Sequence, residues 1–359
     1  MTDRALSAPG KLFVSGEYAV LWGGVARIAA VAPRVSAFVR TRDDRRVDIV
    51  LEEGRLTGTA TPAGVKWASE VTPAFRFVAH TLDLAYRIGA HDGPGFAVAF
   101  EPSPTADGQK LGFGSSARAT VLAAEAARSA LGGTFDALKL ALLAHADAQK
   151  GKGSGGDVAA CFAGGLVRYR RYPTEPLIVA ANSNGLASAL SASAPVDVLR
   201  TPGLTQPMLY AFSGASASTT SLITQIEREW NDARRARFVE TSDGYGDALE
   251  QALLRRDFAA VTEACNALQA LLWTLGATQN PGLERLLALA ATYGCTGKQS
   301  GAGGGDGALL FAPDDDSRTA LLTGLRERNI FAMPVDFSPG LRGDATPLAE
   351  LSLWLQSGW

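Results

Sequence analysis

The sequence predicts a two-domain protein of mixed class, either α/β or α+β. Segments with the apolar spacing of strands alternate with segments of helical spacing in both halves of the 359-residue chain. A stretch rich in Ser, Ala, Asn and Pro at residues 183–206 separates the two halves. At this length, with 47% hydrophobic residues, the chain can bury two cores. We therefore expect domains at residues 1–190 and 191–359.

The first half begins with predicted strands. They lie at residues 11–15, 25–40, 47–51, 55–60 and 96–100. A break is expected near Pro33, and Glu53-Gly54 predicts a hairpin turn. A helix is predicted at 72–88, because Thr72 can cap it and proline suits the first turn. Further helices are expected after Ser115 and at about 135–149, then a helix end turning into a strand at 159–169.

The second half repeats the alternation. Its predicted elements are a strand at 208–213, long helices within about 219–275, a helix near 281–293, a loop within 297–307, a strand at 308–311, a helix at 317–329 and a strand at 331–337. Both halves therefore combine strands with helices that can cover them.

Composition narrows the class of protein. The formal net charge of -2 gives no sign of a nucleic-acid or membrane-surface partner. Cys161, Cys265 and Cys295 are widely spaced and form no CxxC pair, which is typical of thiols in a reducing compartment. The start of the chain lacks the pattern of a signal peptide, and no apolar stretch suits a bilayer. We expect a cytoplasmic protein.

Most of the lysines lie in or beside loops rich in Gly and Ser. The chain has seven lysines against 27 arginines, and five of the seven have this position: Lys11, Lys110, Lys150, Lys152 and Lys298. A compact ammonium group beside mobile backbone is a common way to bind phosphate. Chance clustering is the alternative.

One of these loops, at Lys110–Ala117, precedes an Ala-rich stretch that is predicted to be a helix. Ser115 or Ser116 can cap this helix, its free N–H groups can bind an anion, and glycines at 112 and 114 let a ligand come close to the backbone. Residues 112–117 also fit the G-x-G-x-x-A dinucleotide pattern. That pattern should follow a strand directly, but residues 101–109 (EPSPTADGQ) lie between the preceding predicted strand and this loop. No G-x-x-x-x-G-K-[ST] P-loop motif occurs.

Three further stretches are also rich in glycine and are candidates for binding phosphate. Residues 8–24 (APGKLFVSGEYAVLWGG) can be a strand between two turns, residues 297–311 (GKQSGAGGGDGALLF) predict a tight anion-binding loop, and Asp157 follows a glycine run. Asp157 can be a helix cap, or an acid–base or metal carboxylate in a phosphate site.

Taken together, the stretches resemble the GHMP kinase superfamily of galacto-, homoserine, mevalonate and phosphomevalonate kinases. They match its three motifs in order, over nearly the full chain. Within the superfamily, GEYAV at 16–20, SGASASTTSLI at 213–223 and KQSGAGGGD at 298–306 are most similar to bacterial-type phosphomevalonate kinases.

The resemblance implies an α+β fold. The N-terminal, ATP-binding domain would be like ribosomal protein S5 domain 2, with a left-handed βαβ crossover, and the C-terminal domain would be ferredoxin-like. ATP would lie between them, with its triphosphate on Lys110, Gly112, Gly114, Ser115, Ser116 and Ala117.

The resemblance also implies roles for single residues. Ser116 would bind Mg²⁺, Ser115 a phosphate, Asp157 would be the catalytic aspartate, and Lys11 would reach the transferring phosphoryl group. The residues expected at the acceptor are Tyr18, Lys152, Ser154, Ser213, Ser216, Ser218, Lys298, Ser300, Gly301 and Ala302. Mevalonate kinases place a magnesium-binding Glu about eleven residues before the Asp, whereas this chain has Ala146 there, with Asp147 and Gln149 nearby.

The implied activity is ATP-dependent phosphorylation of 5-phosphomevalonate, a small phosphorylated acceptor, by a monomer or homodimer. The alternatives are a mevalonate or other small-alcohol kinase, a diphosphomevalonate decarboxylase, and a non-catalytic sensor on the same fold. An alcohol must lose a proton to react, so it would use Asp157 as a base. A phosphate monoester is mostly dianionic near neutral pH and instead needs positive charge around it.

Overall fold

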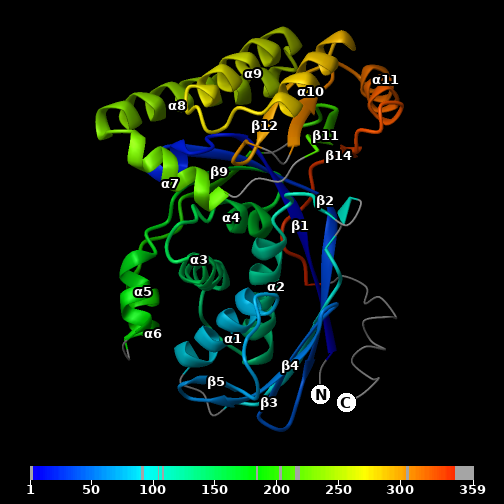
Figure 1. Cartoon of the computed structure of the whole chain (residues 1–359). Helices are drawn as coiled ribbons and strands as arrows, with labels where there is room; N and C mark the ends of the chain where they lie inside the picture. Colours follow the sequence, from blue (N-terminus) through cyan, green and yellow to red (C-terminus); the bar gives the residue numbers. More distant parts are fainter. Residues whose placement is uncertain are drawn as a thin grey trace.

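The computed structural model describes residues 3–89, 93–103, 105–106, 109–182, 185–201, 204–214, 219–304 and 307–343. For residues 106, 109–110 and 219–221 the description covers the backbone. Figure 1 shows a larger part built on long strands and a smaller part covered by helices α8 to α11. None of the described helices is long and apolar enough to cross a membrane.

The larger part contains an eight-stranded sheet in the order β10-β9-β2-β6-β3-β4-β5, with β1 paired to β2. Its strands are β1 (Asp3–Ser15), β2 (Val25–Thr41), β3 (Arg46–Leu51), β4 (Gly54–Thr61), β5 (Gly64–Trp67), β6 (Phe96–Phe100), β9 (Leu166–Arg170) and β10 (Val198–Thr201). All pairs are antiparallel except β3 with β6. A short ribbon of β7 (Thr105–Ala106) and β8 (Gln109–Lys110) leads into the glycine-rich loop at Lys110–Ala117.

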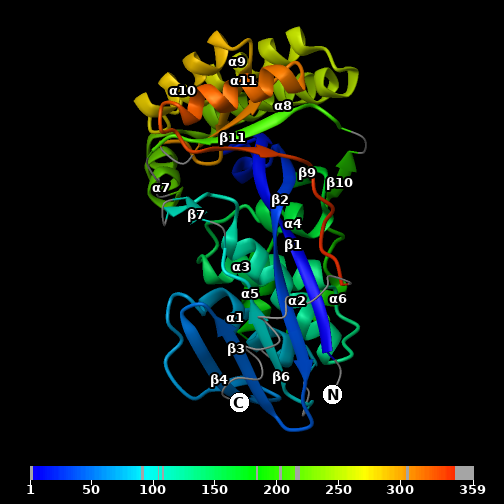
Figure 2. The same ribbon diagram turned by 90° about the vertical axis from the view of Figure 1, so that its right-hand side faces the viewer.

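Helices cover one face of this sheet and share a single apolar core with it (Figure 1). They are α1 (Arg76–Gly89), α2 (Ser115–Ala130), α3 (Ala137–Ala148) and α4 (Gly156–Ala163), followed by α5 (Glu175–Ala181) and α6 (Leu186–Ala192) at the edge. The short 3₁₀ helix η1 (Ala19–Trp22) follows β1. Figure 2 shows β1 and β2 running from this part up to the smaller one.

The smaller part is built on a four-stranded antiparallel sheet in the order β12-β13-β11-β14. Its elements are β11 (Met208–Phe212), α7 (Thr219–Glu229), α8 (Asp232–Arg255), α9 (Phe258–Trp273), α10 (Pro281–Thr292), β12 (Thr296–Ser300), β13 (Gly307–Phe311), α11 (Asp315–Arg326) and β14 (Ala332–Val335). With the strands numbered in chain order, the sheet read from β14 to β12 has the order 4-1-3-2, and this βαββαβ arrangement is ferredoxin-like. The two-domain α+β architecture is therefore confirmed.

The two parts share a core. Leu12 and Val14 of β1 and Ala29 of β2 pack with Tyr210 of β11 and Leu249 of α8 in one buried cluster. The ends of β1 and β2 thus pack against the smaller sheet. This junction places the residues at the end of β1 between the two parts of the molecule.

Some predicted elements need correction. β1 begins at Asp3 rather than residue 11, α1 begins at Arg76, and β2 continues through Pro33, where the pairing with β1 shifts register at a bulge. Proline cannot donate to a ladder, so a bulge accommodates it.

The predicted glycine-rich loop within 297–307 contains a strand, β12. Gly297 lies so close to β13 that an added Cβ would be 2.5 Å from Leu309 O, so glycine permits this pairing. The stretch at 183–206 includes α6 and β10, and β10 belongs to the larger sheet. The boundary at residue 190 stays a prediction.

Candidate active site

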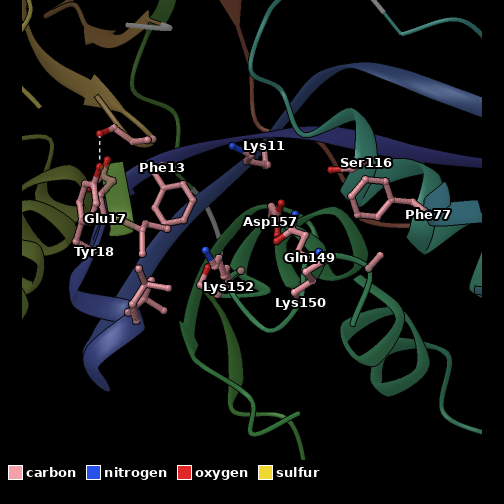
Figure 3. Close-up of a pocket in the computed structure, with 18 of the residues that line it drawn as sticks. Lys11, Phe13, Glu17, Tyr18, Phe77, Ser116, Gln149, Lys150, Lys152 and Asp157 are labelled. Carbon is pink, nitrogen blue, oxygen red and sulfur yellow. Dashed lines mark hydrogen bonds between the residues drawn. The ribbon is translucent and has the colours of Figure 1, made fainter. Parts of the chain in front are cut away.

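A cavity of about 460 Å³ lies where the two parts meet. Its wall combines side chains of β1, η1, α1, α2 and α7 with the loop between α3 and α4 and the loop after β12 (Figure 3). The residues that were predicted for the site and line this cavity are Lys11, Tyr18, Ser116, Lys152, Ser154, Asp157, Gly301 and Ala302. They come from glycine-rich stretches far apart in the sequence.

Lys11 is positioned by a direct contact between β1 and the glycine-rich loop at Lys110–Ala117. The amide of Lys11 donates to Phe113 O at 3.1 Å. Its side chain then passes Gly114, where an added Cβ would lie 3.1 Å from both Cγ and Cε of Lys11. Gly114 also has a φ of 75°, which other residues rarely adopt. Glycine at this position therefore forms the turn and leaves room for the lysine.

Helix α2 begins without a side-chain cap. Its N-cap residue is Gly114, which has no side chain, and the described residues show no side-chain cap at this end of the helix. The prediction that Ser115 or Ser116 caps the helix is wrong, because the left-handed glycine takes that place and both serines lie inside the first turn. The uncapped N–H groups remain available to an anion, with the positive end of the helix dipole behind them.

Asp157 lies in the first turn of α4, after the left-handed Gly155. Its Oδ1 accepts a hydrogen bond from the Val158 amide at 3.0 Å, and its Oδ2 lies 3.8 Å from Nε2 of His145. Ser116 Oγ lies 3.1 Å from the same nitrogen. The first turns of α2 and α4 thus face one another across a buried histidine.

The cavity carries an excess of positive charge. Its basic residues are Lys11, Arg76, Lys150 and Lys152. Its acidic residues are Glu17 and Asp157, and Glu17 is neutralised by a lysine from the other part of the molecule. A cavity with this balance attracts a ligand with several negative charges.

That lysine is Lys298, which is completely buried. Its Nζ lies 2.5 Å from Glu17 Oε1 and donates to Gln299 O at 2.6 Å. Beside this pair, the Tyr18 hydroxyl donates to Ala302 O at 2.5 Å. Tyr18 has a φ of 63°, an uncommon conformation for a residue with a side chain. Two contacts therefore hold the stretches at residues 8–24 and 297–311 together at the cavity wall.

Other predicted residues lie outside the cavity wall. The side chain of Lys298 is directed at Glu17, Ser300 is buried in β12, and Gly112, Ser115, Ala117 and Ser213 do not line the cavity. Ser216 and Ser218 lie outside the described residues, as does the side chain of Lys110. Their assignment to the ligand stays a prediction.

Several cavity residues carried no motif signal. Arg76 begins α1, Phe77 follows it, and Gln149 is the C-cap residue just after α3. Arg76 had one available signal, because a cation in the first turn of a helix is unfavourable next to the helix dipole and suggests another purpose. The position of Phe77 and Gln149 depends on how α1 and α3 pack.

Ala146 occupies the position at which mevalonate kinases have a magnesium-binding Glu, so its neighbours were candidates for a replacement metal ligand. Ala146 is buried, and Asp147 pairs with His80 Nε2 at 2.8 Å, so neither replaces the missing Glu. Within the described chain, no group of three or more His, Cys, Asp or Glu residues could hold a metal ion. The oxygens of Ser116 and Asp157 nevertheless fit Mg²⁺, which in kinases uses one or two protein ligands together with phosphates and water.

A second cavity of about 230 Å³ adjoins the first. Phe77 and Ser116 line both, and the second also contains Ser115 and Arg118. The start of α2 therefore lies between two cavities. This arrangement suits a reaction between two small molecules that meet at Ser116.

The chain matches two family models. Residues 81–165 match the model described as GHMP kinases N terminal domain, and residues 249–330 match the one described as GHMP kinases C terminal. The phosphomevalonate kinase of Streptomyces sp. (strain CL190) is 28% identical over 94% of this chain and 97% of its own.

Solved structures share the fold. A Lin0012 protein from Listeria innocua has a TM-score of 0.83 at 22% identity, covering 96% of this chain and 100% of its own. The Streptococcus pneumoniae phosphomevalonate kinase in complex with phosphomevalonate and AMPPNP has a TM-score of 0.78 at 21% identity, covering 93% of this chain and 99% of its own.

Proposed function

This chain belongs to the GHMP kinase superfamily, and we propose that it transfers the γ-phosphoryl group of ATP to 5-phosphomevalonate, giving 5-diphosphomevalonate and ADP. One observation of the structure carries the choice of acceptor. The cavity gathers Lys11, Arg76, Lys150 and Lys152, while the charge of Glu17 is balanced by Lys298. An acceptor that is already phosphorylated needs this positive charge to approach ATP, whereas an alcohol does not. The similarity to the Streptomyces phosphomevalonate kinase over nearly the full chain supports the same choice.

In the proposed reaction, an oxygen of the acceptor phosphate forms a bond to the γ-phosphorus. The bond from that phosphorus to the bridging oxygen breaks, and ADP leaves with the electron pair. Lys11 neutralises charge that spreads over the transferring group. No proton has to leave the acceptor, so Asp157 orients its neighbours and need not act as a base.

We place the ATP phosphates at the uncapped start of α2 and the nucleoside in the second cavity. Ser115 and Ser116 lie in that first turn and line the second cavity. When bound, Mg²⁺ would neutralise phosphate charge in the transition state. Ser116 and Asp157 are the residues that would hold it.

We also propose a reducing compartment, such as the cytoplasm. Cys161, Cys265 and Cys295 are free and buried in the structure. Burial raises the pKa of the Cys161 and Cys265 thiols to about 12, so both remain protonated near neutral pH.

The first test is the choice of acceptor. The purified protein with Mg²⁺ and ATP should release ADP with 5-phosphomevalonate, and much less with mevalonate, homoserine or galactose. Turnover should fall below about pH 6, because the phosphate monoester then takes up its second proton. A coupled ADP-release assay measures both. Turnover with mevalonate and none with 5-phosphomevalonate would overturn the proposal in favour of an alcohol kinase.

The second test concerns Asp157. Asp157→Asn keeps the shape of the side chain and removes its charge. With a phosphate acceptor we expect kcat to fall by less than about 10²-fold, because general-base catalysis, worth roughly 10²–10⁴-fold, is not needed. The kcat of the pure variant at saturating substrates measures this. Because Asp157 would also hold Mg²⁺, the kcat is measured over rising Mg²⁺ concentrations. A loss near 10⁴-fold that saturating Mg²⁺ does not relieve would instead identify Asp157 as a base.

A further inference from the structure

His145 is a buried histidine that the proposed reaction does not yet use. It lies near the end of α3 with its side chain 2% exposed. Its ring stacks on Phe77 with centroids 5.1 Å apart and planes 29° from parallel. The ring orientation is thus fixed by a residue that lines both cavities.

Among the described residues, the polar contacts of the imidazole are made by Nε2. They go to Ser116 Oγ at 3.1 Å, to the Gln149 amide at 3.4 Å and to Asp157 Oδ2 at 3.8 Å. These three partners line the same cavity. Packing alone does not require the polar atom of a buried histidine to contact three cavity residues, so these contacts indicate a role at the cavity.

The other ring nitrogen indicates the tautomer. His145 Nδ1 is buried and has no hydrogen-bond partner in the described part of the chain. A buried N–H without an acceptor is rare, so Nδ1 is best assigned as the unprotonated nitrogen. Nε2 then carries the hydrogen, which suits the nearby Asp157 carboxylate and the Ser116 oxygen. In this tautomer the Gln149 amide nitrogen, 3.4 Å away, cannot donate to Nε2, so the amide is assigned with its oxygen on that side.

With Nδ1 unprotonated and hydrogen on Nε2, the ring is neutral. A neutral imidazole with hydrogen on Nε2 can donate to Ser116 Oγ. One lone pair of the hydroxyl is then occupied, and the other lone pair and its hydrogen are left for the cavity.

We propose that His145 is a positioning residue: its Nε2–H holds the Ser116 hydroxyl, and through it the metal–nucleotide site, in one orientation opposite Asp157. This inference rests on the proposed kinase function, in which Ser116 binds Mg²⁺. Partners that orient a metal ligand typically change metal affinity by 10- to 100-fold when they are removed.

The experiment measures equilibrium binding rather than turnover. Calorimetry compares the affinity for Mn²⁺·AMPPNP with that for AMPPNP alone, for the wild type and for variants at position 145. His145→Phe retains the stacking ring and loses the donor, and His145→Asn places its amide near Nδ1. Both should weaken Mn²⁺·AMPPNP binding about 10-fold or more and leave metal-free binding unchanged. His145→Gln places an amide near Nε2 and should restore affinity to within about threefold of the wild type.

Two controls make the result specific. His80→Gln changes a histidine that pairs with Asp147 outside the cavity wall, and it should leave Mn²⁺·AMPPNP binding unchanged. In a Ser116→Ala background, His145→Asn should add little further loss, because His145 acts through the Ser116 hydroxyl. Thermal unfolding identifies any variant that fails to fold. If His145→Phe does not fold, His145→Gln and His145→Asn still compare two polar side chains that differ in where they place the amide.

The inference is overturned if His145→Asn binds Mn²⁺·AMPPNP as tightly as the wild type. It is also overturned if His145→Gln loses as much affinity as His145→Asn, or if the effects of His145→Asn and Ser116→Ala are additive. Failure of the proposed function is a separate result, because a wild type that binds Mn²⁺·AMPPNP but phosphorylates no acceptor refutes only the kinase assignment.

Discussion

Replacing Lys11 with methionine is expected to lower kcat by about 10²–10³-fold with little effect on folding. Removing one preorganised group that stabilises charge in a transition state has an effect of this size. Lys11 is partly buried at the cavity, its Nζ lies 5.5 Å from the centre of the Phe13 ring, and its stem passes Gly114. Methionine keeps that stem and removes the positive charge. Steady-state kinetics with Mg²⁺, ATP and 5-phosphomevalonate measure the change.

The matched control is Lys66→Met, at an exposed lysine of β5 remote from the cavity lining. It should leave kcat within about twofold of the wild type, as expected for an exposed position that contacts no ligand. If Lys11→Met also retained kcat, the transferring group would have another partner. The assignment of Lys11 would then be wrong, whatever the acceptor.

The largest effect on stability is expected at Lys298. Lys298→Met leaves the Glu17 carboxylate buried without its partner, since Glu17 is 3% exposed and its Oε2 has no other partner in the described part of the chain. Breaking a buried ion pair from one side costs about 3–5 kcal/mol of unfolding free energy. Urea denaturation followed by circular dichroism and by tryptophan fluorescence measures it, and the two transitions should coincide.

Two further variants test the cause. Glu17→Gln combined with Lys298→Met removes the unpaired charge, so the double variant should be more stable than Lys298→Met alone. Asp197→Asn breaks the exposed pair with Arg170 and should cost less than about 1 kcal/mol. A loss at Lys298 as small as that at Asp197 would show that the buried pair contributes little.

The glycine-rich stretches could be predicted because their signals are local. Gly114 and Gly155 each adopt a left-handed conformation just before a helix. Such a turn can be recognised from a few consecutive residues. The alternation of strands and helices is equally local, and it predicted most elements to within a few residues. Predictions failed where a local signal was misleading: Gly297 suggested a loop, although close contact with its partner strand explains the glycine.

The composition of the cavity depended on the packing of distant elements. Arg76 and Gln149 had no motif, and the role of His145 emerges only when α2, α3 and α4 are packed together.

The pattern of residues along the chain therefore predicted the two-part α+β architecture and the grouping of Lys11, Ser116 and Asp157 in one site. That Lys298 pairs with Glu17, 281 positions away in the chain, followed only from the folded structure. In a sequence, a lysine beside glycines looks the same whether it meets a phosphate or a buried carboxylate. The partner of such a lysine depends on how the two sheets pack, because a buried charge must be neutralised by an opposite charge that lies next to it in the folded protein.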